Sequence, residues 1–437
     1  MKIRKTLLAI LLLSALNGAT IYSLSAQSIS TSPYSRFGIG ELIPQTNTRS
    51  KAMGGISQGL NYSGEINFNN PASYSTFDTL TFLLDFGFTG SFNNMKSFDA
   101  SSKTTNAYVD YITFGFPIIK RWHTAIGIVP VSSMGYDIYS VHDEGDFEGV
   151  EGIGSVQQHF IGNGSFNRVF WGNSFKINKN FSVGINFGYM FGNSRFNRLL
   201  HFVDSSYMRT ANVANLVYVS DFTFEPGFQY TADLSPKDKI VVGATVMIPK
   251  KMSAEKSSLV YSDYDNQGSY VDTILYSKPE KGHIYYPTSL SAGLSYQRAN
   301  RITVGADFEW SNWAKYESFD VKDTAVLSNC WGIGIGAEIL PSDKAAAKYF
   351  QRVAYRFGFK TRQQILQFED KDINEYAVTL GMGLPITRSK TKINLYFEFG
   401  RRGTMGSEEN KLIRDNYFKI GAGLSLNEMW FYKRQYR

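Results

Sequence analysis

Two stretches of the chain carry residue types that could do chemistry, and each lacks part of the required pattern. Gly55–Gly59 matches the Gly-x-Ser-x-Gly motif of serine hydrolases, with Ser57 at its centre. That motif needs a strand, a sharp turn and a helix around it, followed by an acid and a histidine. No such context surrounds Ser57, so a turn is the better interpretation. Asp263–Gly268 resembles the start of a calcium loop, but Ile274 stands where the loop needs a carboxylate.

Metal and redox chemistry are equally poorly supported. The five histidines do not show metal-ligand spacing, and Cys330 is the single cysteine. We therefore expect no catalytic residue, no metal site, no cofactor and no enzyme activity. Weak calcium binding by the loop at 263–268 stays open, although a solvated turn is the simpler interpretation. The formal net charge is +7, and removing Lys2, Arg4 and Lys5 with a cleaved N-terminal segment leaves +4 (7 − 3), which is too small to indicate a nucleic-acid partner.

The elements that would position any site are indicated by the stretch Phe181–Phe191. Its odd positions are large and apolar, and its even positions, except Met190, are small or polar. Successive side chains of a strand point to opposite faces. An apolar face beside a face of Ser, Gly and Asn fits a strand between lipid and a crowded lumen. Tryptophans such as Trp310 and Trp313 are then expected in the aromatic girdles at the bilayer surfaces.

The N-terminus indicates export. Lys2, Arg4 and Lys5 precede an apolar stretch too short to span a bilayer, and small residues follow near Ala26. This pattern predicts a cleaved signal peptide over 1–26. Residues 27–77 are rich in Ser, Asn, Gly and Pro without sustained alternation. Such a segment is either a flexible tail or an N-terminal hatch, or plug, held inside a larger structure, and we predict the plug.

From residue 78 onward the alternating pattern recurs about fourteen times, which predicts an all-β, antiparallel transmembrane barrel over 78–427. A C-terminal periplasmic tail would cover 428–437. The predicted connections alternate between long and short, as they do in outer-membrane barrels with long extracellular loops. An even number of strands with this alternation of connections predicts an outer-membrane protein of a Gram-negative bacterium, with both termini in the periplasm. Pro341–Phe350 is long for a periplasmic turn and is expected to form a helical turn.

The same alternation sorts the charged side chains, because an Arg or Lys on the lipid face costs about 2–4 kcal/mol near the midplane. The predicted luminal charges are Asp85, Asp221, Glu225, Asp307, Glu309, Glu338, Arg352, Arg356, Glu398 and Lys419. Arg36, Arg49 and Lys51 of the plug are candidate ion-pair partners for them. The alternative is that these charges line a wet pore.

Several motifs resemble one family. Asn69-Asn70-Pro71-Ala72, directly before the first predicted strand, resembles the junction between hatch and barrel in FadL-like outer-membrane proteins, which transport long-chain fatty acids and aromatic hydrocarbons. Tyr286–Leu294, Ala306–Trp313 and Tyr355–Phe359 are similar to successive strands of that family. The general character of the sequence, including its end at Trp430–Arg434, resembles that of Bacteroidota members of the family.

The resemblance implies a fourteen-stranded barrel with a luminal hatch, and passive uptake of hydrophobic, fatty-acid-like molecules by lateral diffusion past the hatch. In the family's transporters, substrate leaves sideways at a kink in the third strand. The third strand here is predicted over 121–137 and contains Val129, Pro130 and Gly135. Proline removes a hydrogen-bond donor from the ladder, so a kink there is reasonable. The alternative places Pro130 beyond the end of the strand.

The predicted extracellular loops depart from such transporters. Loop 138–155 carries Asp143, Glu144, Asp146, Glu148 and Glu151, and loop 251–282 is polar and rich in tyrosine. An alternative function is therefore a structural or interaction subunit of an outer-membrane protein assembly or secretion machine. Outer-membrane lipid is the expected partner. A hydrophobic ligand or detergent in the lumen, and other outer-membrane proteins, stay open.

Overall fold

The protein folds as a closed antiparallel β-barrel in a computed structural model. The structure describes residues 30–143, 154–202, 209–263, 271–299, 301–319, 321–322, 327–344, 346–368, 371–386, 390–407 and 412–429. The sheet closes because its last strand, β19 (Arg414–Met429), pairs with its first barrel strand, β2 (Thr81–Lys96). Fourteen strands cross the barrel, which confirms the predicted fold class.

Before β2 the described chain forms η1 (Pro33–Arg36), β1 (Glu41–Leu42), α2 (Thr48–Lys51) and η2 (Pro71–Thr76). The barrel continues with β3 (Ser101–Ile119), β4 (Trp122–His142), β5 (Val156–Lys176), β6 (Phe181–Phe202), β7 (Thr210–Asp233), β8 (Asp238–Met247), β9 (Lys250–Asp263), β10 (Val271–Tyr286), β11 (Ser289–Arg298) and β12 (Ile302–Ser311). After η3 (Trp313–Lys315) come β13 (Glu317–Ser318), β14 (Val321–Lys322), β15 (Cys330–Ile339), η4 (Tyr349–Gln351), β16 (Ala354–Phe368), β17 (Lys371–Pro385) and β18 (Lys392–Arg402).

Two of the crossing strands are interrupted, and this corrects the predicted loop at 251–282. β8 continues into β9 and β10 into β11, so most of 251–282 is a long hairpin. The upper strands β9 and β10 pair with each other, while β8 and β11 pair below them. The polar residues here belong to strands without a continuous apolar face, which is why sequence alternation suggests a loop.

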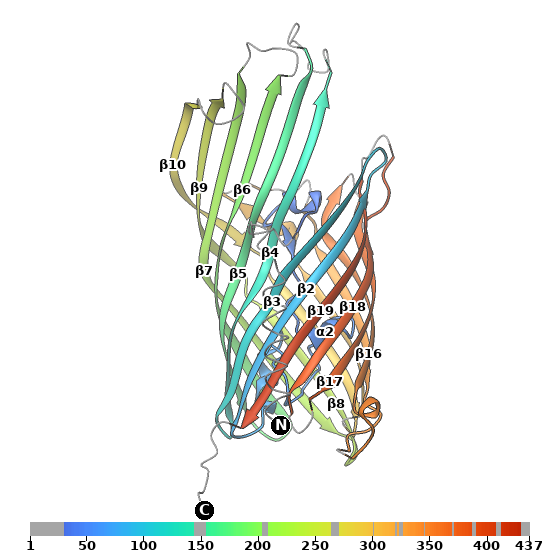
Figure 1. Ribbon diagram of the computed structural model, residues 1–437. Helices are drawn as coiled ribbons and strands as arrows, with labels where there is room; N and C mark the ends of the chain where they lie inside the picture. The colour runs from blue at the N-terminus through green and yellow to red at the C-terminus, as the bar shows by residue number, and fades with distance from the viewer. Residues whose placement is uncertain are drawn as a thin grey trace, which may run out of the picture.

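The barrel is much taller on one side. Figure 1 shows β4–β7, β9 and β10 rising well beyond β2, β3 and β16–β19. We call these six strands the tall wall, the end to which they rise the tall end, and the opposite end the turn end. Connections at the turn end are short, except for 340–353, where the 3₁₀ turn η4 lies at the end of the segment predicted to form a helical turn. Within the described residues, no helix is long and apolar enough to cross a bilayer.

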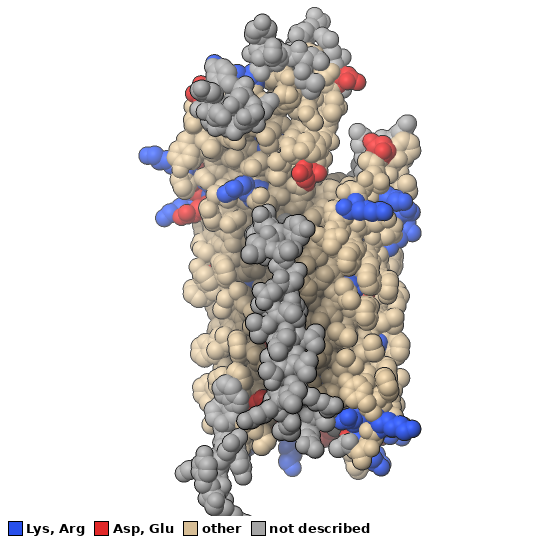
Figure 2. Space-filling view, viewed as in Figure 1, with Lys and Arg blue, Asp and Glu red and all other residues tan. Residues whose placement is uncertain are grey.

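The outer surface follows the predicted alternation. Phe187, Phe308 and Phe357 are 41%, 49% and 50% exposed on the outside of three strands. Figure 2 shows two levels of charged side chains on the visible face, separated by a band that carries few charges. This band is the surface that a lipid bilayer would cover.

The interior is filled rather than open. An apolar cluster toward the tall end packs Ile39 of the plug against Phe166, Met252 and Trp313, which are each at most 2% exposed. A second cluster surrounds Phe68 on the other side of the plug. The expected place of Trp313 in an aromatic girdle is wrong, because it follows the end of β12 and its ring packs against Tyr286.

Candidate functional site

The candidate site is the plug and the wall that holds it. Residues 30–77 run through the interior of the barrel, and α2 lies inside it in Figure 1. The predicted junction Asn69–Ala72 forms the start of η2. Asn70 caps this turn by accepting a hydrogen bond from the Ala72 amide, and it donates to the Gln58 and Phe228 carbonyls. The junction therefore ties the plug to β7 as well as to itself.

A buried ion-pair network joins α2 to the barrel wall. The Arg49 guanidinium donates to both carboxylate oxygens of Glu338 on β15, at 2.7 and 3.0 Å. Arg356 of β16 donates to the same carboxylate at 2.6 Å. These side chains are at most 10% exposed. Removing one partner of a buried pair leaves an uncompensated charge and costs about 3–5 kcal/mol.

A second plug cation, Lys51, pairs with Asp110 of β3 at 2.5 Å. Asp110 is absent from the predicted luminal charges for a clear reason. The β2–β3 register passes from Gly87–Tyr111 to Phe88–Val109 and skips Asp110. This bulge lets Asp110 and Tyr111 both point inward, whereas strict alternation would send them to opposite faces.

The third plug contact uses backbone donors. Asp307 of β12 accepts hydrogen bonds from the amides of Ser57 and Gln58 at 2.6 and 2.8 Å. The Ser57 hydroxyl also contacts this carboxylate, at 3.3 Å. The Gly-x-Ser-x-Gly motif is thus a plug turn anchored to the wall. Within the described residues, no group of three or more His, Cys, Asp or Glu could hold a metal ion.

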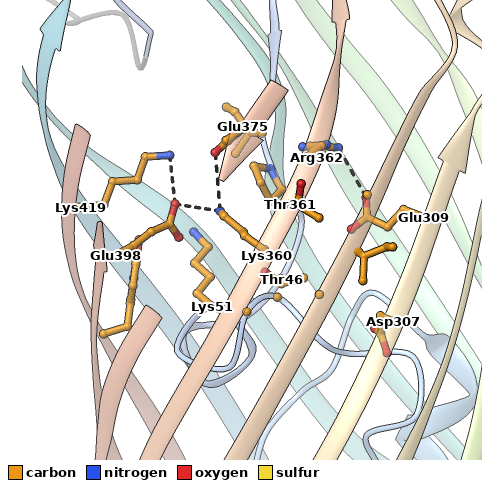
Figure 3. A pocket seen from close by; sticks show the side chains of 18 of the residues that line it. Thr46, Lys51, Asp307, Glu309, Lys360, Thr361, Arg362, Glu375, Glu398 and Lys419 are labelled. Carbon is orange, nitrogen blue, oxygen red and sulfur yellow. Dashed lines mark hydrogen bonds and ion pairs between the residues drawn. The ribbon is translucent and has the colours of Figure 1, made fainter. Parts of the chain in front are cut away.

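Most of the other predicted luminal charges point inward and are paired. Glu225 contacts Arg168 at 3.2 Å, and Asp85 accepts a bond from Ser425. Asp221 pairs with Lys250 beside the break between β8 and β9. In Figure 3, Lys360 bridges Glu375 and Glu398, Lys419 also reaches Glu398, and Glu309 faces Arg362. These residues line a narrow polar chamber beside the plug.

Arg352 is the exception among the predicted luminal charges. It ends η4 in the turn-end connection, before β16 begins at Ala354, and its guanidinium lies over the Tyr349 ring. Sequence alternation placed it in the lumen because the strand was expected to begin three residues earlier.

Glycines of the wall let the plug backbone approach closely. A Cβ added to Gly336 would lie 2.2 Å from the Met53 carbonyl oxygen, and one added to Gly358 would lie 2.1 Å from the Gly54 nitrogen. Gly54 itself has a φ of +67°. The small residues on the inner face are therefore contact points for the plug.

The barrel wall has a seam between β3 and β4. Their ladder runs from Ile119–Trp122 only as far as Ile112–Ile128. Above that point, β4 pairs with the plug strand β1, through Leu42–Ser132 and Glu41–Ser133. Pro130 lies within β4 at a bulge that skips Val131, so it is not beyond the end of the strand. Gly135 donates its amide to the Ser35 hydroxyl.

The plug also contacts the other side of the seam. Thr31 bonds Thr104 of β3 at 2.7 Å, and the Tyr34 hydroxyl donates to the Ile413 carbonyl. Glu41 pairs with Arg402 of β18, which also contacts Asp415 at 2.9 Å. The segment 30–43 is therefore a wedge between β3 and β4. A cavity of about 510 Å³ lies beside it, between the β2–β3 hairpin and β4.

Sequence reasoning missed the wedge contacts, because Glu41 sits in an irregular segment and Arg402 at a strand end. The predicted signal peptide, the acidic run 144–151, the remainder of the calcium-like loop after Asp263 and most of the C-terminal tail lie outside the described residues.

Comparison with known proteins gives a family and a fold. A family model described as BamG matches residues 2–437. Among solved structures, the toluene transporter TbuX of Ralstonia pickettii matches with a TM-score of 0.57 and 15% identity, covering 87% of this chain and 98% of its own. The CymD monoaromatic hydrocarbon channel matches with a TM-score of 0.55 and 12% identity, over 89% and 98%. A Pseudomonas aeruginosa FadL homologue matches with a TM-score of 0.54 and 14% identity, over the same shares. No curated protein sequence matches the chain.

These structural matches show a shared FadL-like barrel fold. These three neighbours are a monoaromatic hydrocarbon channel, a toluene transporter and a FadL homologue, and none of them is described as an enzyme.

Proposed function

This chain belongs to the BamG family, and we propose that it is a closed outer-membrane barrel whose main role is to hold partner proteins. The longer hairpins are at the tall end and the short turns at the opposite end. Outer-membrane barrels carry their long loops outside the cell and their short turns in the periplasm. We therefore place the tall wall outside the cell and both termini in the periplasm.

The observation that carries this proposal is the filled lumen. Ion pairs and backbone hydrogen bonds hold the plug on several sides, through Glu338, Asp110 and Asp307. The chamber beside it is lined with charged side chains, which would have to be desolvated by a passing hydrophobe. The apolar cluster toward the tall end is packed, with Met252 and Trp313 at most 1% exposed. An apolar ligand would have to open this cluster to enter.

The tall wall supplies the surface that such a role needs. Its strands continue beyond the other side of the barrel (Figure 1), and several of their side chains are exposed. Tyr139 and Tyr276 are 59% and 61% exposed, and Val141 is 61% exposed. These exposed side chains stand at both edges of the tall wall, on β4 and β10, where partner proteins could contact them outside the bilayer band.

The test is gentle purification from native outer membranes, followed by mass spectrometry of the proteins and lipids that co-elute. Stoichiometric protein partners are expected. Ser258 and Ser277 face each other in the β9–β10 ladder. A variant that joins them with an Asn-Gly turn removes the upper part of this hairpin and should lose partner proteins. The matched control joins Asn94 to Lys103 on the low side. A barrel that elutes alone with stoichiometric hydrophobe would overturn the proposal.

One observation favours a second function, lateral uptake of hydrophobic molecules. The β3–β4 seam is closed by the wedge rather than by barrel hydrogen bonds, and a cavity of about 510 Å³ adjoins it. Movement of the wedge would open a sideways path into the bilayer.

A cross-link separates the two functions. Leu42→Cys and Ser132→Cys, in a Cys330→Ser background, would join the wedge to β4 at paired positions. Oxidation should leave partner binding intact if the barrel is a holding subunit. If oxidation instead stops uptake of a radiolabelled fatty acid into cells, and reduction restores it, lateral transport is the function.

A further inference from the structure

A second cavity, of about 310 Å³, lies toward the tall end and is lined by the plug and four strands of the tall wall. Arg36 comes from the end of η1, Tyr136 from β4, Phe160 from β5 and Arg198 from β6. Val213 and Asn215 of β7 complete one side of it. The site lies apart from the polar chamber, and no contact described above uses it.

Two arginines meet at one ring in this cavity. The guanidinium carbons of Arg36 and Arg198 lie 4.9 and 5.1 Å from the centre of the Phe160 ring. In the part of the chain that the structure describes, neither guanidinium is within 4.0 Å of a carboxylate oxygen. By contrast, Arg49, Arg168, Arg356 and Arg402 each contact a carboxylate.

We propose that this cavity binds a carboxylate or phosphate group. Two guanidinium groups offer many N–H donors in planar forks, which suit the oxygens of such anions. Both positively charged residues line this cavity, so an anion bound there would be favoured electrostatically. Tyr136 and Asn215 also line the cavity, and Phe160 and Val213 give it an apolar side.

This site goes beyond the holding role, because it links two parts of the molecule. Arg36 belongs to the wedge segment, and Arg198 belongs to the tall wall. A ligand that contacts both would tie the wedge to the wall. The proposal depends only on these side chains, so it stands or falls separately from partner binding.

The experiment is calorimetric titration of the full-length barrel in a neutral detergent at low ionic strength. The two probes are sodium phosphate and sodium benzoate. Arg36→Gln and Arg198→Gln should each weaken binding at least tenfold, and Arg198→Lys should retain part of it. Arg195→Gln is the matched control, because it removes the same charge from the opposite face of β6. Heat-modifiable migration on gels verifies that each variant is folded.

Each outcome is decisive. Saturable binding of phosphate alone would indicate a free or headgroup phosphate, and binding of benzoate alone would indicate a carboxylate attached to an apolar body. Either result supports the anion site, provided that it weakens as salt is added. No saturable binding of either probe, or an equal loss in Arg195→Gln, overturns it.

Discussion

Arg49 of the plug and Glu338 of β15 form a bidentate ion pair, and Arg356 of the neighbouring strand contacts the same carboxylate. This one carboxylate therefore joins the plug to two strands of the wall. All three charged groups are buried, and their mutual pairing offsets the free-energy cost of removing them from water. The plug is thus held as part of the folded barrel and not merely enclosed by it.

The ion pair leads to the first prediction. Glu338→Gln should destabilise the seated plug by about 3–5 kcal/mol, because two buried guanidiniums lose their counter-charge. Limited proteolysis should then cleave within 30–77 while the barrel resists. Asp272→Asn is the control, since its pair with Arg209 is exposed and such pairs contribute about 0–1 kcal/mol. Equal protease resistance of Glu338→Gln and the wild type would show that the pair does not hold the plug.

The wall glycines lead to a second prediction, made with two alanine substitutions on one strand. Gly336→Ala should displace the plug, because its Cβ would lie 2.2 Å from the Met53 carbonyl oxygen. Gly332→Ala should be tolerated, because its nearest neighbour would be 3.6 Å away. Hydrogen exchange of the segment around Met53 measures the difference. Similar protection in both variants would contradict the close packing described here.

Much of this architecture follows from the sequence, and the failures have physical causes. Alternation predicts the strands and most luminal charges, because lipid outside and protein inside impose opposite demands on neighbouring residues. It misses Asp110, because a bulge breaks the alternation, and it misplaces Arg352, because a strand end carries no sharp signal. Alternation also fails to predict the β9–β10 hairpin and suggests a loop there, because strands outside a bilayer need no apolar face. The wedge could not be predicted, because its pairing with β4 depends on the gap left by β3.

The wedge leads to a third prediction. Arg402→Met removes the cation shared by Glu41 and Asp415 and should loosen residues 30–43. Increased hydrogen exchange in that segment, with unchanged exchange in β17, is the expected result. Arg401→Met on the same strand is the control, because its exposed side chain points to the other face. If both variants exchange alike, the Glu41–Arg402 contact does not secure the wedge.

The last prediction concerns the plug as a whole. Deleting residues 27–77 should convert the barrel into an ion-conducting pore in planar bilayers, because the β19–β2 pairing and the lower β3–β4 ladder still join the wall when the plug is removed. The emptied lumen would expose charged side chains such as Glu338, Arg356 and Glu398 to water, and a polar lumen conducts ions. The intact protein should be nearly silent, and Glu338→Gln should show intermittent openings as the plug leaves its seat. A folded deletion variant that stays silent would mean that the wall collapses inward or that other segments close it, and the filled lumen would then not depend on the plug.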